Sequence, residues 1–254
     1  MPVISTQKVT VLPAGMEIAA GNVSDLINSS ASGQNTAIGS SYETVSRLGG
    51  IRNELYKYPL QEDTGQQIKL VSTSTTDNNS GGDAARKIMI RGLGPNAVEQ
   101  VEVLPINGTT QVTSNMYWTA VEILLVHQTG SGGDTNAGDI TAYANDGTTA
   151  LVQMATGEGL GSGAFKYCPA GKNVYLTQFF ASAINEAEIA IFSRRNNKGW
   201  QARQTIFLKD NAQNYVSELP IQLREGDAME VRAIRLGDTD AKVSVDFQVA
   251  VETV

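Results

Sequence analysis

The chain has 254 residues, of which 41% are hydrophobic and 25 are glycine, and its formal net charge at pH 7 is −7. This length suits one large all-β domain or two small domains. The negative net charge argues against a nucleic-acid-binding protein, because such proteins carry an excess of basic residues that displaces counterions. The single cysteine, Cys168, excludes an intrachain disulfide and a cysteine zinc cluster, so we expect synthesis in a reducing compartment. The N-terminus lacks the pattern of a secretory signal, and no apolar run approaches the roughly 20 residues of a membrane span. We therefore expect neither nucleic acid nor a membrane as a partner.

Residues 1–60 predict an N-terminal arm that is largely extended, with at most one short helix near residues 23–28. Apolar residues are sparse, and NSSASGQNTAIGSS (28–41) is low in complexity. Such a segment cannot fold alone, so we expect it to become ordered on a neighbouring subunit. The alternative is that it packs along its own sandwich and covers an edge strand. The expected partner contacts are its dispersed apolar and aromatic residues: Val9, Val11, Leu12, Ile18, Leu26, Leu48, Leu55, Tyr56 and Tyr58.

Residues 61–254 predict an all-β domain, an antiparallel β-sandwich of jelly-roll-like form. The clearest signal is AKVSVDFQVAV (241–251), where Val243, Val245 and Phe247 share one face and polar side chains occupy the other. This period of two is typical of a half-buried antiparallel strand. Weaker versions recur from about Gln67 onward, divided by turn-forming residues, and no helical pattern interleaves with them. Two sub-sandwiches divided near residues 160–170 are the alternative to a single one.

The stretch MATGEGLGSGAFKYCPAG (154–171) raises the question of phosphate binding. Its glycines, from Gly157 to Gly163, alternate as Gly-x-Gly-x-Gly-x-Gly. A dinucleotide fingerprint needs Gly-x-Gly-x-x-Gly opening a helix, and Pro169 lies where the helix interior would be. We interpret the stretch as a flexible connection between strands and predict no cofactor.

No catalytic or metal motif is evident. His127 is the only histidine, and neither it nor Cys168 has a recognisable motif partner, so we predict that the protein is not an enzyme. A calcium loop starting at Asp77 would have Ile88 where a bidentate glutamate is needed. Three further turn aspartates leave a structural cation open but predict no metal site: Asp134, Asp139 and Asp146.

SRRNNKGWQAR (193–203) combines basic residues with an aromatic one. Basic groups around an exposed aromatic ring can hold a sugar or an anionic polymer. The simpler interpretation, which we favour, is a hairpin with NNKG as its turn and the arginines in solvent. The residues of the alternative glycan or receptor contact are Arg194, Arg195, Lys198, Trp200 and Arg203.

The order of several segments over residues 40–254 resembles a family of tailed-bacteriophage virion structural proteins from phages of aquatic bacteria and cyanobacteria. The segments are SSYETVSRLGGIRNELYKYP (40–59), IKLVSTSTTDNNSGGDAARKIMIRGLG (68–94), VEQVEVLPINGTTQVTSNMYWTAVEILLV (98–126), GGDTNAGDITAYANDG (132–147), YCPAGKNVYLTQFFAS (167–182) and GDTDAKVSVDF (237–247).

This resemblance implies a non-enzymatic particle component made in the host cytoplasm and located in the virion. It would decorate or cement the capsid, or belong to the neck or tail, as a homo-oligomer, with a trimer favoured. Its other partners would be virion proteins such as the major capsid protein. The alternative is a receptor- or glycan-binding adhesin module of a tail fibre or spike that uses the Trp200 hairpin.

Overall fold

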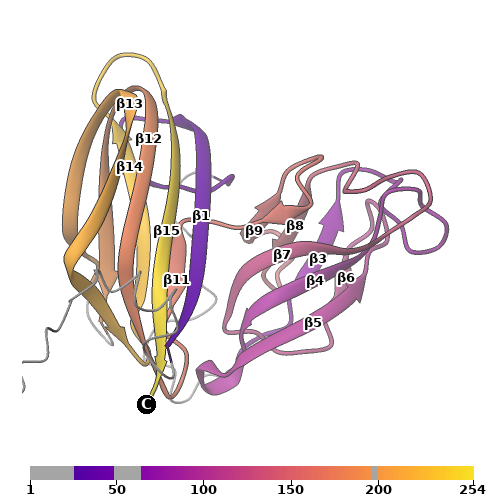
Figure 1. Cartoon of the computed structure of the whole chain (residues 1–254). Coiled ribbons are helices and arrows are strands. Elements are labelled where there is room, and N and C mark those ends of the chain that lie inside the picture. The colour runs from indigo at the N-terminus through magenta and orange to yellow at the C-terminus, as the bar shows by residue number, and fades with distance from the viewer. Residues whose placement is uncertain (1–25, 49–63, 196–198) are drawn as a thin grey trace, which may run out of the picture.

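The computed structural model of the protein describes residues 26–48, 64–195 and 199–254. These residues form antiparallel strands joined by loops and one short 3-10 turn, η2 (Pro95–Ala97) (Figure 1). The strands are β1 (Leu26–Ile38), β2 (Glu43–Thr44), β3 (Lys69–Ser72), β4 (Ala85–Leu93), β5 (Glu99–Pro105), β6 (Val112–Thr113), β7 (Ala120–Thr129), β8 (Ile140–Tyr143), β9 (Ala150–Met154), β10 (Leu160–Gly161), β11 (Phe165–Tyr167), β12 (Lys172–Arg194), β13 (Gln201–Arg224), β14 (Ala228–Arg235) and β15 (Ala241–Thr253).

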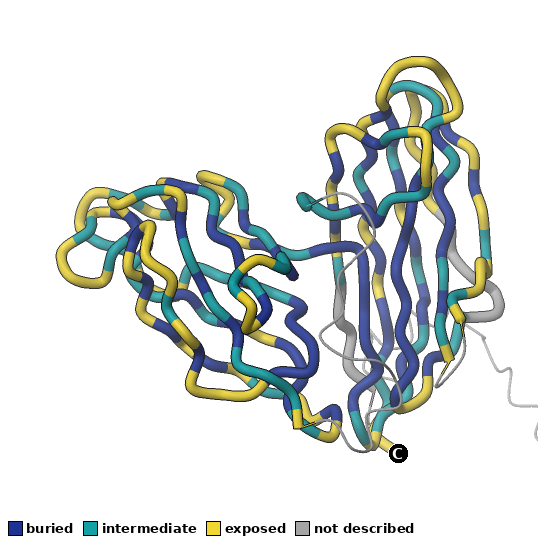
Figure 2. The backbone as a smooth tube through the Cα atoms, turned by 180° about the vertical axis from the view of Figure 1, so that it is seen from behind, coloured by how far each residue is buried: buried dark blue, intermediate teal, exposed yellow. Residues whose placement is uncertain are grey.

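One seven-stranded sheet contains the C-terminal strands. Its order is β1-β15-β12-β14-β11, with β13 paired to β12 and β2 paired to β14. The alternation predicted for β15 is present, since Val243, Val245 and Phe247 are buried whereas Lys242 and Asp246 are exposed. Figure 2 shows the same alternation of buried and exposed residues along other strands.

The long strand β12 carries the chain from one layer of this sheet to the other. It pairs with β15 over residues 172–184 and with β14 over residues 187–194, while β13 follows it along almost its whole length. At the bend, Asn185 and Asp210 have positive φ angles of 67° and 48°, and the Asn185 N–H donates to Asp210 Oδ1 at 2.7 Å. The sheet thus folds over its own core, and the all-β, sandwich-like prediction is confirmed. We call this body the C-terminal sandwich.

Residues 64–163 form a second, smaller sandwich inserted between β2 and β11. Its two four-stranded sheets have the orders β10-β7-β4-β5 and β6-β3-β8-β9. The inward side chains of both sheets, with Trp118 and Phe165, form a separate apolar core. We call this body the inserted sandwich (Figure 1).

Residues 26–48 belong to the C-terminal sandwich, which corrects the predicted boundary between an arm (1–60) and a β-domain (61–254). β1 lies antiparallel to β15, from Leu26 opposite Glu252 to Ile38 opposite Ala241. The alternative expectation, that the segment covers an edge strand of its own sandwich, is what the structure shows for this part. The small residues allow it: a Cβ on Gly33 would lie 2.0 Å from the Val45 carbonyl oxygen.

The other arm predictions divide between described and undescribed residues. Residues 26–28 of the predicted short helix are strand, and residues 23–25 lie outside the described residues. Leu26 begins β1, and Leu48 is half-buried. Seven predicted partner contacts lie outside the described residues: Val9, Val11, Leu12, Ile18, Leu55, Tyr56 and Tyr58.

We predict that Phe247→Ala destabilises the C-terminal sandwich severely. Phe247 is 1% exposed and lies between Ala31 of β1 and Phe179 of β12, so truncation leaves a cavity that costs about 3–5 kcal/mol. Chemical denaturation monitored by circular dichroism measures the loss. The control is Asp246→Ala at the neighbouring exposed position, expected within about 0.5 kcal/mol of the unmodified protein. An equal loss of stability in both variants would contradict the assignment of Phe247 to the buried face of β15 and of Asp246 to its exposed face.

Candidate functional site

The glycine-rich stretch is a structural connection that leads from β9 through β10 into β11. Gly157 and Gly159 have positive φ angles of 80° and 68°, which suit glycine in tight turns. The buried Asn136 fixes the turn: its Oδ1 accepts from the Gly159 N–H at 3.0 Å, and its Nδ2 donates to the Ala155 carbonyl at 2.8 Å. The glycines therefore shape a turn around an asparagine side chain and open no helix.

The two residues considered for nucleophilic chemistry lie in different sandwiches. Cys168 is fully buried in the C-terminal core, and its thiol donates to the Lys172 carbonyl at 3.1 Å. Burial, reinforced by the Asp227 carboxylate, raises the pKa of the Cys168 thiol to about 12. His127 is exposed near the end of β7 in the inserted sandwich. The thiol is thus held protonated, with no described contact to the histidine.

Three of the four aspartates considered for a cation, Asp77, Asp139 and Asp146, serve as caps of loops. Asp77 is fully buried and accepts from Ser72 Oγ at 2.6 Å and from the Gly138 N–H at 2.9 Å, with two further backbone donors. Hydrogen bonds from the Thr149 hydroxyl and backbone hold the pKa of Asp146 at about 2. Asp139 accepts from the backbone and hydroxyl of Thr156. Among the described residues no group of three or more His, Cys, Asp or Glu side chains is arranged to hold a metal ion.

The Trp200 hairpin has its basic residues close to the ring. Arg194 and Arg232 lie over the Trp200 ring with their guanidinium carbons 5.1 and 5.0 Å from its centroid. Arg203 donates to Ser193 Oγ at 2.6 Å. The structure therefore brings Arg194, Arg203 and Trp200 to one end of the β12–β13 hairpin. The half-buried ring contacts arginines of its own chain, which leaves less of it for a sugar.

The remaining members of that predicted site add little to it. Arg195 is exposed, and Lys198 lies outside the described residues.

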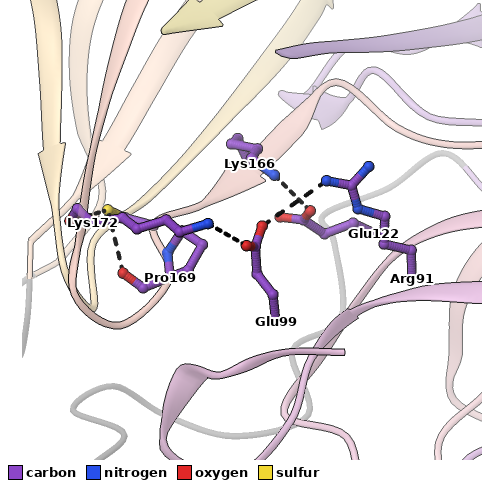
Figure 3. A network of polar contacts seen from close by, with 7 residues as sticks. Arg91, Glu99, Glu122, Lys166, Pro169 and Lys172 are labelled. Atoms are coloured by element: carbon purple, nitrogen blue, oxygen red, sulfur yellow. Dashed lines mark hydrogen bonds and ion pairs between the residues drawn. The ribbon is translucent and has the colours of Figure 1, made fainter. Parts of the chain in front are cut away.

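A polar network joins the two sandwiches (Figure 3). Lys166 of β11 and Glu122 of β7 form an ion pair at 2.8 Å, and each side chain is only 7% exposed. The Tyr167 N–H donates to the second oxygen of Glu122 at 3.0 Å. Nearby, Lys172 of β12 and Glu99 of β5 form a more exposed ion pair. These contacts fix one sandwich against the other, because a buried ion pair is favourable only in well-defined geometry.

Apolar contacts support the same junction. Leu93, Ala97 and Ala120 of the inserted sandwich form a buried cluster with Tyr167 and Ala228 of the C-terminal sandwich.

A cavity of about 220 Å³ lies beside this junction. Ala31 and Ser32 of β1 line one side, and Arg91, Ile123 and Leu160 of the inserted sandwich line the other. It marks where the outer surface of the β10-β7-β4-β5 sheet meets the C-terminal sandwich.

The outer surface of that sheet carries one apolar row, and beside this row Arg91 lies between Val101 and Ile123. Val103 lies opposite Met89, Met89 opposite Leu125, and Leu125 opposite Leu160, so one apolar row crosses all four strands. Directly paired residues of antiparallel strands share a face of the sheet. Val101, Val103 and Leu160 are 49%, 38% and 45% exposed. We call this surface the apolar face, made of Met89, Val101, Val103, Ile123, Leu125 and Leu160.

The apolar face extends round the edge of β5. Val98, Met116 and Tyr117 are 57%, 40% and 52% exposed. Two inward side chains of β5 place the segment 115–117 there: Gln100 donates to the Tyr117 carbonyl at 2.7 Å, and Glu102 accepts from the Asn115 N–H at 2.8 Å. We call Val98, Met116 and Tyr117 the rim.

Sequence reasoning missed the apolar face. VEQVEVLP (98–105) alternates, but its inward positions include Gln100 and Glu102 whereas its outward positions include Val101 and Val103. A period of two identifies the strand without identifying which face is buried. The sequence did contain one indication of the apolar face: Val101 and Val103 alternate with the polar residues Gln100 and Glu102, so one side of the strand is apolar.

No protein-family model matches the chain, and no curated protein is significantly similar to it. In the part of the chain that the structure describes, no helix is long and apolar enough to cross a membrane.

We predict that Glu122→Ala destabilises the protein by about 3–5 kcal/mol. The change leaves the buried Lys166 ammonium without its carboxylate and removes the acceptor of the Tyr167 N–H. Denaturant unfolding measures the loss. The matched control is Glu186→Ala, which removes the partner of the 70% exposed Lys209 and should cost far less, because solvent screens an exposed ion pair. Similar losses in the two variants would contradict a structural role for the buried pair.

We also predict that Cys168 is inert in the folded protein. With a pKa of about 12, about one thiol in ten thousand is ionised at pH 8, and the sulfur is fully buried. A chromogenic disulfide reagent should label it at least about 100-fold more slowly than in the unfolded chain. Equal rates before and after denaturation would show that the thiol is accessible.

Proposed function

We propose that this protein is a non-enzymatic structural component of a tailed-bacteriophage virion. It decorates or cements the capsid, or forms part of the neck or tail, as a homo-oligomer for which we favour a trimer. The observation that carries the proposal is the apolar face, a surface suited to binding another protein.

The physical argument begins with exposure. A contiguous apolar patch of several side chains is uncommon on a monomeric soluble protein and marks an interaction surface. The apolar face crosses four strands and continues into the rim, whereas the opposite side of the same sheet already contributes Ile88, Ile90 and Leu124 to a buried core. Part of the apolar face lies beside the C-terminal sandwich at the cavity, whereas Val101 and Val103 of β5 stay exposed and open to a partner.

The junction supports an assembly role. The buried Lys166–Glu122 pair and the apolar cluster at η2 hold the two sandwiches together. A protein that binds two neighbours in an assembly benefits from such fixed geometry, because its two binding surfaces then keep one orientation relative to each other. The order of segments along residues 40–254 supports the virion assignment.

The adhesin alternative rests on the Trp200 hairpin. Trp200 already stacks with Arg194 and Arg232, and it packs against the apolar cluster at the junction. A sugar platform needs an aromatic face open to solvent. We therefore rank the adhesin below the structural component.

Quantitative mass spectrometry of purified particles, with heads and tails separated, tests the proposal. A decoration or cement protein is expected in heads at a copy number comparable with that of the major capsid protein, and a neck or tail component at fewer copies in the tail fraction. Absence from particles made by a host that expresses the protein would contradict the proposal.

A pair of variants connects that measurement to the apolar face. Val103→Glu places a charge at the β5 end of the apolar row and should lower incorporation into particles at least about tenfold, because a desolvated unpaired carboxylate is costly. Thr109→Glu, at an exposed position of the same sandwich outside the apolar face, is the control and should be incorporated normally.

A further inference from the structure

We propose that β5 pairs with β5 of a second copy of this chain, antiparallel and about a two-fold axis at Val101. The contact joins two inserted sandwiches through one continuous sheet. It deepens the proposed function, on which its biological meaning rests, by naming the surface through which copies of the protein meet.

The main chain of β5 is open on one side. The Ile106 N–H donates to the Arg86 carbonyl at 3.0 Å, so this residue faces β4. Main-chain groups alternate in direction along a strand, and therefore Glu99, Val101 and Val103 point theirs away from β4. Within the described ranges no strand pairs with β5 on that side. Such a row of donors and acceptors is hydrated when it is exposed, and it is a template on which another β-strand can pair.

β5 has little of the usual protection of an edge strand, since its one proline, Pro105, is its last residue. Proteins blunt exposed edges with short strands, lysines or prolines. The edge strands β6 and β10 have two residues each, and the edge strand β13 carries exposed Arg203 and Lys209. β5 has seven residues, and its outward side chains include two exposed valines. The carboxylates of β5 do not repel a second strand from this edge, because Glu99 is paired with Lys172 and Glu102 is buried.

Charge selects the register. A two-fold axis at Glu102 would place two buried carboxylates opposite each other, which is unfavourable. An axis at Val101 places Val101 opposite Val101 of the second copy and Gln100 opposite Glu102, an amide beside a carboxylate. In this register the three residues whose main-chain groups point to the open edge, Glu99, Val101 and Val103, each lie opposite a residue that has a main-chain N–H group. An axis at Val103 would instead pair Val101 with Pro105, which has none.

A second copy fits this edge because the complementary features recur on the same strand. The two-fold arrangement extends the apolar row of one sandwich into that of the other. It also brings together the two rims, which contain Met116 and Tyr117. A trimer formed elsewhere on the chain would be joined to its neighbours by the same contact.

Site-specific crosslinking of the full-length protein tests the axis. In a hydrogen-bonded antiparallel pair the Cα atoms lie about 5.5 Å apart, within the range that a disulfide spans. Val101→Cys should therefore form a covalent dimer under mild oxidation, seen on non-reducing gels. Val103→Cys alone should not, because its expected neighbour is Glu99. The unmodified protein controls for Cys168, which is buried and should stay monomeric on the gel.

The outcomes are decisive. Failure of Val101→Cys to crosslink at concentrations where light scattering shows association overturns the contact, and so does a protein that stays monomeric throughout. Crosslinking only in a mixture of Val101→Cys and Val103→Cys chains overturns the register. A chain that crosslinks but is absent from virions refutes the proposed function alone, whereas a virion protein that does not crosslink refutes the β5 contact alone.

An independent variant blocks the edge. Val101→Lys places two ammonium groups against each other at the axis and should raise the dissociation constant measured by light scattering at least about tenfold. Thr205→Lys, exposed on the edge strand β13, is the matched control and should leave the constant unchanged. Thermal unfolding of both variants should stay near that of the unmodified protein, which separates lost association from lost folding. An unchanged dissociation constant for Val101→Lys overturns the proposal.

Discussion

The pairing of one edge of β12 with two different strands is the constraint on which the structure depends. β12 lies beside β15 over its first half and beside β14 over its second half, and the bend at Asn185 turns the strand from one layer to the other. Because β13 accompanies β12 through this bend, the Asp210 carboxylate lies where it accepts from the Asn185 N–H. The two layers can then close over one core that contains Phe179 and Phe247.

This arrangement decides where the rest of the chain can go. The free edge of β15 receives β1, and the edge of β14 receives β11 and β2. Since β2 and β11 both pair with β14, the chain between them leaves the C-terminal sandwich and returns to it at nearly the same place. An insertion whose ends are close together can fold as its own unit, as residues 64–163 do with their separate core.

The short strand β11 links both cores and the junction. Phe165 packs in the inserted sandwich, Lys166 forms the buried pair with Glu122, and Tyr167 belongs to the apolar cluster at η2. A buried ion pair adds little net stability by itself, but a partner that is removed leaves an uncompensated charge. The pair therefore enforces one arrangement of the sandwiches. That arrangement leaves the apolar face and the free edge of β5 as the surfaces through which we propose that the protein assembles.

The sequence by itself determined many of the strands and several turns. The alternation in AKVSVDFQVAV predicts β15 and its buried face, because Val and Phe on one side and Lys and Asp on the other leave one orientation. Glycine spacing with Pro169 excluded a phosphate loop, and the structure shows a turn held by Asn136. These are local patterns, and their physical cause lies within a few residues along the chain.

Only the tertiary structure decided which strands pair and which faces are covered. The low-complexity residues of β1 carry little pattern of their own, and they form a strand because the edge of β15 is available. β5 alternates too, but its polar Gln100 and Glu102 turn inward because Asn115 and Tyr117 meet them there, which leaves Val101 and Val103 outside. Trp200 looked like a candidate for a ligand until Arg232, 32 positions along the chain from it, was found over its ring. Each of these outcomes depends on contacts between residues distant in sequence, and a period of two carries no information about them.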